Sequence, residues 1–194
     1  MTAGHIPGPA LDRLEELRGG EGVLTPDTRV VTVQAHRALI RDDAAVFQPL
    51  GDLDTDAAGV VLLGARDEGV YAARAVDDDD VAALEEATGG RFQSLRWAGA
   101  RLPEWHAGLL FYAAGLLAWH RRARHCGACG VATRPVRSGH QRVCGNPECG
   151  QVHFPRADPA IITLVRRDDR ALLVHQPAWP EGRFGLVTSL EDSV

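Results

Sequence analysis

Three stretches in the first half of the chain are rich in β-branched residues and alternate in part between apolar and polar positions. They are RVVTVQAHRALI (29–40), AAGVVLLGAR (57–66) and GVYAARAV (69–76), separated by Asp and Gly clusters. This pattern is typical of strands. We predict a mainly antiparallel sheet in which the second and third stretches form a hairpin, with Asp67, Glu68 and Gly69 at its tip.

One helical pattern precedes these strands, and two follow them. LDRLEELRGG (11–20) predicts a short helix ended by two glycines, and DDDDVAALEEATGG (77–90) predicts a helix with acids in its first turn. The Asp run is best explained as a helix start and solvated loop rather than a cation site. PEWHAGLLFYAAGLLAWHR (103–121) carries the strongest signal, and Pro103 suits a first turn. Its apolar stripe is assigned to core or a subunit interface rather than to a ligand site: Trp105, Leu109, Tyr112, Leu116 and Trp119.

The chain after residue 159 returns to a strand pattern. AIITLVRRDDRALLVHQPAW (160–179) predicts two strands joined at Arg167, Asp168 and Asp169, and RFGLV (183–187) predicts another. A sheet, a long helix and further strands together predict an α+β fold.

Composition narrows the class of protein. The chain has 194 residues, of which 45% are hydrophobic and 24% charged, as in ordinary globular proteins. No apolar run approaches the roughly 18 residues of a membrane span, and the start lacks the pattern of a signal peptide, so we expect a cytoplasmic protein without a membrane partner. The net charge of −5 gives no general reason to expect nucleic-acid binding.

All four cysteines lie between residues 126 and 149. They form Cys126-x2-Cys129, fourteen intervening residues and Cys144-x4-Cys149. Two such pairs at this distance favour a zinc ribbon over a redox role for the first pair, because four thiolates complete a tetrahedral shell around Zn²⁺. No position is left for water, so the zinc is predicted to be structural. The neighbouring histidines are then surface or packing residues: His125, His140 and His153.

The same region is locally basic. Six arginines precede the first acid, Glu148: Arg121, Arg122, Arg124, Arg134, Arg137 and Arg142. They fit a solvated face that balances an acidic remainder, a set of contacts to substrate phosphates, or the basic face of a nucleic-acid module. The sequence leaves these three explanations open.

The order of these parts resembles the NADH pyrophosphatase branch of the Nudix hydrolases, also called NAD(+) diphosphatases. The resemblance rests on LLAWHRRARHC, the x2, x14, x4 cysteine spacing, FPRADPAII and AWPEGRF. It implies a rudimentary Nudix-like β-rich domain at 1–122 that includes the long helix, a zinc ribbon at 123–153, and the first strands of an incomplete catalytic Nudix domain at 154–194. Family members hydrolyse NADH and NAD⁺ to nicotinamide mononucleotide and AMP, some remove an NAD cap from RNA, and they are commonly homodimers.

The resemblance also implies two substrate-binding residues. Phe154 stands where the family has a base-stacking aromatic residue, usually Tyr, and a core role is the alternative. Arg96 falls near a family arginine that contacts substrate. An acidic substrate contact of the family is missing, because Gly139 occupies its position.

The end of the chain departs from the family pattern. A glutamate-rich box, REUxEExGU with U aliphatic, binds Mg²⁺ or Mn²⁺ in the family and is required for hydrolysis. Here the sequence reads TSLEDSV, so we assign no catalytic residue and expect Glu191 and Asp192 not to perform catalysis. Truncation, a natural pseudoenzyme and completion by a partner chain remain the explanations, and the abrupt end favours truncation.

Missing strands would leave an unpaired sheet edge and exposed apolar residues in the last segment, which predicts aggregation, dimer pairing or partial disorder: Ile161, Leu164, Leu172 and Val174. The primary hypothesis is therefore an NAD(H) diphosphatase-family protein that is inactive as this chain alone. The alternative is a non-catalytic zinc-ribbon protein that binds a nucleotide, RNA or a protein partner.

Overall fold

The computed structural model describes residues 11–20, 22–54, 59–67, 69–156, 160–177 and 179–190. The chain divides into two compact units, residues 1–155 and 156–194, which are described separately. The predicted domain boundaries at 122/123 and 153/154 stay predictions.

The first unit is built on a mixed sheet with the strand order β3-β2-β1-β6-β5, in which β4 also pairs with β1 and β7 with β2. Its strands are β1 (Arg29–Gln34), β2 (Arg37–Arg41), β3 (Ala44–Ala45), β4 (Phe47–Pro49), β5 (Val61–Arg66), β6 (Gly69–Ala75) and β7 (Arg91–Ser94). All described pairings are antiparallel except β1 with β6, which is parallel. The predicted mainly antiparallel sheet is confirmed.

The β5–β6 hairpin is also confirmed, with a register shift between Leu62 and Gly64. Asp67 at its tip has a φ of 52°, whereas Glu68 lies outside the described residues.

The helices of this unit are η1 (Glu15–Gly19), η2 (Leu50–Asp52), η4 (Asp78–Asp80), α1 (Val81–Thr88), α2 (Leu95–Ala98) and α3 (Glu104–Arg122). Helices form in the three predicted segments, and two short helices that were not predicted, η2 and α2, are added. The first predicted helix is a single 3-10 turn instead of an α-helix. No helix within the described ranges is long and apolar enough to cross a membrane.

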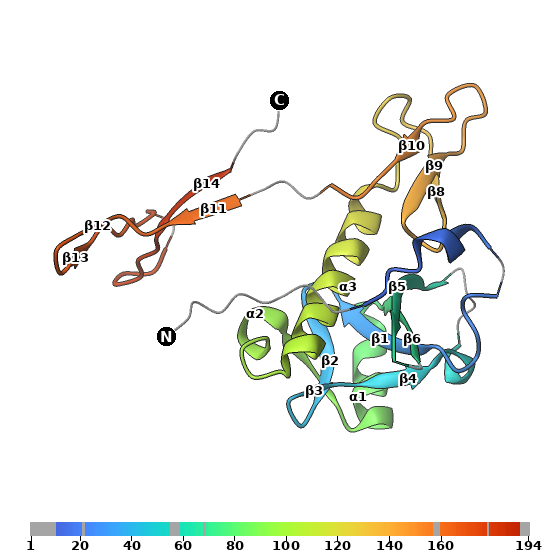
Figure 1. The fold of residues 1–194 in the computed structure, drawn as a ribbon, viewed down its shortest axis with the longest axis horizontal. Helices are drawn as coiled ribbons and strands as arrows, with labels where there is room; N and C mark the ends of the chain where they lie inside the picture. Colours follow the sequence, from blue (N-terminus) through green and yellow to red (C-terminus); the bar gives the residue numbers. More distant parts are fainter. Residues whose placement is uncertain are drawn as a thin grey trace. The chain divides into compact units, whose positions relative to one another are not determined.

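Helix α3 lies across one face of the sheet and forms the main core with it (Figure 1). Alternation along β1 explains this, because Val31 and Val33 belong to the core under α3 whereas Val30 packs in a smaller cluster with Leu50 and Ala72. The apolar stripe of α3 lies in or against the main core, as predicted. At its start the Trp105 ring stacks on Phe47, with ring centroids 5.7 Å apart.

After α3 the chain forms a three-stranded antiparallel ribbon. It consists of β8 (Thr133–Val136), β9 (Gln141–Cys144) and β10 (Val152–His153), in the order β10-β9-β8. Figure 1 shows the ribbon, in orange, at the C-terminal end of α3, while α2 lies near the other end of that helix.

The second unit contains two small antiparallel pairs. In one, β11 (Ala160–Thr163) pairs with β14 (Val187–Leu190), and in the other β12 (Arg166–Arg167) pairs with β13 (Arg170–Ala171). The predicted turn at 167–169 is confirmed, with Asp168 at a φ of 55°. The strand predicted after it is limited to β13. Beyond β13, Leu172 N–H donates to the Val165 carbonyl at 2.8 Å, and Val174 forms a bridge with Gly185.

Two of the apolar residues predicted to be exposed in this unit are so. Leu164 and Leu172 expose 56% and 53% of their surface, while Val174 is half-buried. The side chain of Ile161 lies outside the described part of the structure. Glu191 and Asp192 also lie outside the described residues, so their predicted lack of a catalytic role stays a prediction.

Candidate metal centre

Two tight turns present the four cysteines. In the first, Gly130 N–H donates to the Cys126 carbonyl at 2.8 Å, and Cys126 N–H donates to Val131 at the same distance. In the second, the N–H groups of Cys149 and Gly150 donate to the Asn146 carbonyl at 3.1 and 2.9 Å. Strand β9 supplies Cys144 itself. The short ribbon strands therefore bring two sequence-distant pairs to one point.

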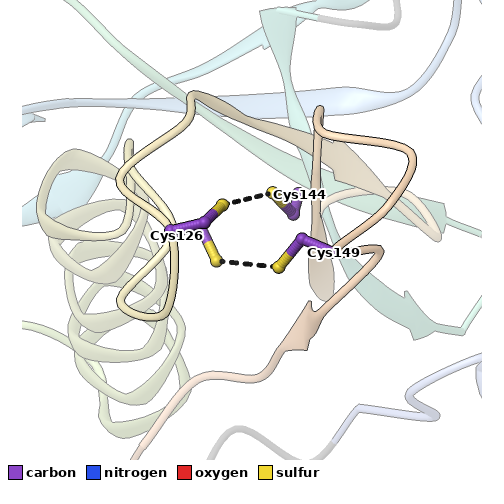
Figure 2. A group of neighbouring side chains, drawn as sticks. Cys126, Cys144 and Cys149 are labelled. Carbon is purple, nitrogen blue, oxygen red and sulfur yellow. Dashed lines mark hydrogen bonds between the residues drawn. The ribbon is translucent and has the colours of Figure 1, made fainter.

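The sulfur atoms form a compact group. All four lie within 4.8 Å of one another; Cys126 and Cys149 are 3.8 Å apart, and Cys129 and Cys144 are 3.4 Å apart. Figure 2 shows the labelled side chains converging on a common centre. Zinc–sulfur bonds of about 2.3 Å in a tetrahedron place sulfurs about 3.8 Å apart. The spacing suits a metal ion and far exceeds the roughly 2.05 Å of a disulfide.

Backbone hydrogen bonds and burial act in opposite directions on the pKa values of these thiols. The N–H groups of Ala128 and Cys129 donate to Cys126 and lower its pKa to about 6. The Asn146 N–H lowers the pKa of Cys144, but burial and the neighbouring sulfurs outweigh it and raise that pKa to about 12. Four adjacent thiolates repel one another unless a cation lies between them. The four cysteines thus fit a structural Zn²⁺.

The turn between β8 and β9 fastens the ribbon to the sheet. Leu62 on β5 donates its N–H to the Ser138 carbonyl at 3.0 Å, and the Nε2 atom of His140 lies 2.7 Å from the Leu62 carbonyl. Ser138 also donates to the Arg18 carbonyl at 3.2 Å. His140 is a packing residue, as predicted.

A second link joins the ribbon to α3. Arg142 donates to the Thr133 hydroxyl at 2.7 Å, to the Thr133 carbonyl at 2.8 Å and to the Nδ1 atom of His120 at 2.8 Å. His120 in turn lies 2.7 Å from the Gly139 carbonyl through its Nε2 atom. Sequence reasoning missed this network. Strand alternation was the available signal, because Arg142 and Cys144 are the two buried residues of β9.

The other histidines beside the cysteines differ in environment. His125 is exposed and forms a bridge with Ala132, as expected for a surface residue. His153 is half-buried, and its side chain hydrogen-bonds Cys126 and lowers the pKa of that thiol. His153 therefore lies directly beside the sulfur group without belonging to it.

The predicted substrate residues are not brought together. Phe154 follows β10 and exposes 58% of its surface, which argues against a core role. Arg96 is exposed on α2, and α2 lies near the N-terminal end of α3, whereas the ribbon follows the C-terminal end (Figure 1). Outside the four cysteines, the described part of the chain has no group of three or more His, Cys, Asp or Glu side chains that could hold a metal.

Comparison with known proteins gives two family matches, one in each of the first two parts of the chain. Residues 13–119 match the NADH pyrophosphatase-like rudimentary NUDIX domain, and residues 121–154 match the NADH pyrophosphatase zinc ribbon domain.

The relatives include the NAD-capped RNA hydrolase NudC of Mycobacterium tuberculosis, which is 41% identical over 100 residues. That match covers 51% of this chain and 31% of the relative. The NAD-capped RNA hydrolase NUDT12 of Macaca fascicularis is 36% identical over 92 residues, covering 43% of this chain and 20% of the relative. The chain spans about a third or less of these relatives. With a rudimentary Nudix domain followed directly by the matching zinc ribbon, it belongs to the NADH pyrophosphatase branch of the Nudix family.

Proposed function

We propose that this chain supplies the rudimentary Nudix domain and zinc ribbon of a homodimeric NAD(H) diphosphatase whose substrate is NAD⁺, NADH or the NAD cap of RNA. One observation carries the proposal. Four sulfurs lie within 4.8 Å of one another in a ribbon that is fastened to a rudimentary Nudix sheet. Both relatives are named NAD-capped RNA hydrolases, which supports this substrate class.

The metal in this proposal is one structural Zn²⁺ held by Cys126, Cys129, Cys144 and Cys149. Four sulfur ligands leave no open coordination position, so the ion stabilises the ribbon and does not activate water. Elemental analysis is expected to give one zinc per chain, with loss of the metal in Cys129→Ser and in Cys144→Ser.

Catalysis needs groups that these 194 residues do not contain. Pyrophosphate hydrolysis in this family depends on Mg²⁺ or Mn²⁺ held by a glutamate cluster, and the printed sequence has no REUxEExGU box. We propose that the 194-residue chain by itself does not hydrolyse NADH.

Phe154 is the proposed base-stacking residue. The residue is more than half exposed and lies directly after the last ribbon strand, and a phenyl ring has the apolar face on which a nucleotide base can stack. Stacking of one base on an aromatic ring contributes about 1–3 kcal/mol. Arg96 is proposed as a second substrate contact, from α2.

The test uses the zinc-loaded 194-residue chain. NADH hydrolysis with Mg²⁺ or Mn²⁺ is expected to stay at background, while NAD⁺ binds measurably by calorimetry. Phe154→Ala is expected to weaken NAD⁺ binding about tenfold, since it removes the stacking surface. Phe154→Tyr keeps the ring and is the matched control. Turnover of NADH by this chain, or equal affinity of the Ala and Tyr variants, contradicts the proposal.

A second candidate function is a non-catalytic zinc-ribbon protein that binds a nucleotide, RNA or a protein partner. The cluster of arginines around the ribbon favours this second candidate. A basic surface attracts phosphates whatever the RNA sequence is and whether or not the RNA carries an NAD cap. Equal affinity for capped and uncapped RNA would support this candidate, whereas a clear preference for the NAD cap supports the first.

A further inference from the structure

A cavity of about 510 Å³ lies between the C-terminal end of α3 and the ribbon, and none of the four cysteines is among its described lining residues. We call it the α3–ribbon pocket. Its polar and charged lining includes His120, Arg121, Arg124, His125 and Arg142, and Leu117 contributes apolar surface. Pockets of about 300–1,000 Å³ are the usual size for small-molecule ligands.

The pocket has positive charge without a nearby counterion. The part of its lining that the structure describes contains no Asp or Glu. Within the described ranges, none of the ion pairs involves Arg121, Arg124 or Arg142. Three guanidinium groups therefore line one cavity without a carboxylate partner.

Arg142 is the most unusual member because it is buried, with 9% of its surface exposed. The groups that it contacts are neutral oxygens of Thr133 and the ring of His120. These bonds fix the direction of the guanidinium but do not neutralise its charge. A buried charge without a partner of opposite sign is costly, and an anion in the adjacent pocket would offset that cost.

Basic residues at the C-terminal end of a helix are ordinarily explained by their attraction to the negative end of the helix dipole, here that of α3. That end is equivalent to about half an elementary charge. Arg121 belongs to the last turn of α3 and fits this explanation. Arg124 follows the helix and Arg142 comes from β9, so the pocket contains a clear excess of positive charge.

The chemistry of the lining selects the ligand class. Planar guanidinium groups bind the oxygens of a phosphate in pairs, with short charge-assisted hydrogen bonds. The volume and the apolar surface of Leu117 accommodate an organic group attached to that phosphate. We propose that the α3–ribbon pocket binds the phosphate group of a small phosphorylated molecule, such as a sugar phosphate or mononucleotide. This site is separate from Phe154 and does not depend on the function proposed above.

The experiment uses the zinc-loaded 194-residue chain in phosphate-free buffer. Ribose 5-phosphate is the main probe because it has no base to stack on Phe154. Ribose is the uncharged comparison. Inorganic phosphate and an uncapped RNA trinucleotide are tested in parallel. Binding is measured by calorimetry, and amide NMR shifts at Thr133 and His125 locate it. We expect saturable binding of ribose 5-phosphate and phosphate, and none of ribose.

The double variant Arg121→Gln, Arg124→Gln is expected to weaken ribose 5-phosphate binding at least about tenfold, because it removes two charge-assisted contacts. Both side chains are exposed, so zinc content and folding should be unchanged. The matched control is Arg122→Gln, which removes an exposed charge between them that does not line the pocket, and it should change the affinity less than about twofold.

Three results would overturn the proposal. The first is that neither phosphate probe shows saturable binding at probe concentrations up to about 10 mM. The second is an equal loss of affinity in the Arg122→Gln control. The third is binding of the RNA trinucleotide alone, which would assign the arginines to a surface patch for nucleic acid. Unchanged ribose 5-phosphate binding in Phe154→Ala would keep this site distinct from the proposed NAD contact.

Discussion

At position 139 the backbone has a φ of +88°, and a β-carbon would lie 2.5 Å from a Val61 methyl carbon. Both facts require glycine. The family's acidic substrate contact therefore has no room here without a shift of the β8–β9 turn away from β5. Glycine at this position matches the close packing between the ribbon and the sheet.

Gly139→Ala is expected to lower the free energy of unfolding by at least about 2 kcal/mol. The left-handed backbone contributes about 1–2 kcal/mol of that loss and crowding against Val61 about 1–3 kcal/mol. Chemical denaturation measures it. Gly22→Ala is the control, because Gly22 has a φ of +90° and nothing within 4 Å of the added carbon. Equal destabilisation in both variants would show that the Val61 contact is not tight.

Residues whose roles depend on local spacing were the predictable ones. The four cysteines could be recognised as one candidate metal site from their spacing alone, because each pair is close in sequence, and the structure brings their sulfurs within 4.8 Å of one another. The contact of Gly139 with Val61 and the bonds of Arg142 to His120 join positions far apart in sequence. No local pattern encodes such distances, so these contacts could not be predicted.

At the scale of elements, the β8–β9 turn is the connection between metal site and sheet. His140 is its central side chain, because its ring approaches the Leu62 carbonyl at 2.7 Å and lies near the ring of Tyr112. Burial lowers the pKa of His140 to about 4, although the Leu62 carbonyl acts in the opposite direction. The charges of Arg18, Arg13 and His120 add to the lowering.

This pKa predicts a pH dependence of stability. The unfolded chain takes up a proton at this position near pH 6.5, while the folded chain does so only near pH 4. The contribution of neutral His140 is complete above about pH 6.5 and is lost as the pH falls towards 4. The slope is at most about 1.4 kcal/mol per pH unit, and solvent screening at this half-buried ring reduces it.

The measurement compares the native chain with His140→Gln in denaturant titrations from pH 7.5 to 4.5. Release of zinc at low pH affects both chains alike, so the difference between their slopes isolates the histidine. Glutamine retains a donor for the Leu62 carbonyl but does not titrate. Parallel curves over this range would mean that His140 is protonated equally in the folded and unfolded chains.

Where the apolar pattern was clear, it predicted correctly whether a segment forms a helix or a strand. Helix α3 and the β5–β6 hairpin were predictable because their apolar positions repeat with a clear period and their ends carry Pro, Gly or Asp. The segment after Asp169 was predicted as a full strand, but its strand is limited to Arg170–Ala171, followed by a bridge at Val174. A run such as RALLVH satisfies strand preferences, yet a strand also needs a partner along its length.

At the scale of the whole molecule, the least predictable feature was the parallel pairing of β1 with β6. Side chains alternate between the two faces in parallel and antiparallel strands alike, so the pattern in the sequence cannot give the direction of a neighbour. That pairing places the β5–β6 hairpin beside β1, and β5 then receives the ribbon turn at Leu62. The position of the metal centre thus depends on a contact that only the structure reveals.

Removal of the metal is expected to unfold the ribbon and leave the sheet intact. The main core joins α3 to the sheet through residues such as Val31, Ala73 and Leu109, and it includes no cysteine. The ribbon has only short strands and few buried apolar side chains, so its folding energy must come largely from the metal.

Hydrogen exchange with and without a zinc chelator measures this directly. Exchange at the amides of Cys126, Cys144 and Leu62 should accelerate at least about tenfold in the metal-free chain, because their acceptors lie in the ribbon. Amides of Val31 and Ala73 in the central strands should keep their protection. Loss of protection in the central strands as well would mean that the sheet cannot fold without the ribbon. Unchanged exchange throughout would mean that the sulfur group does not hold a structural metal.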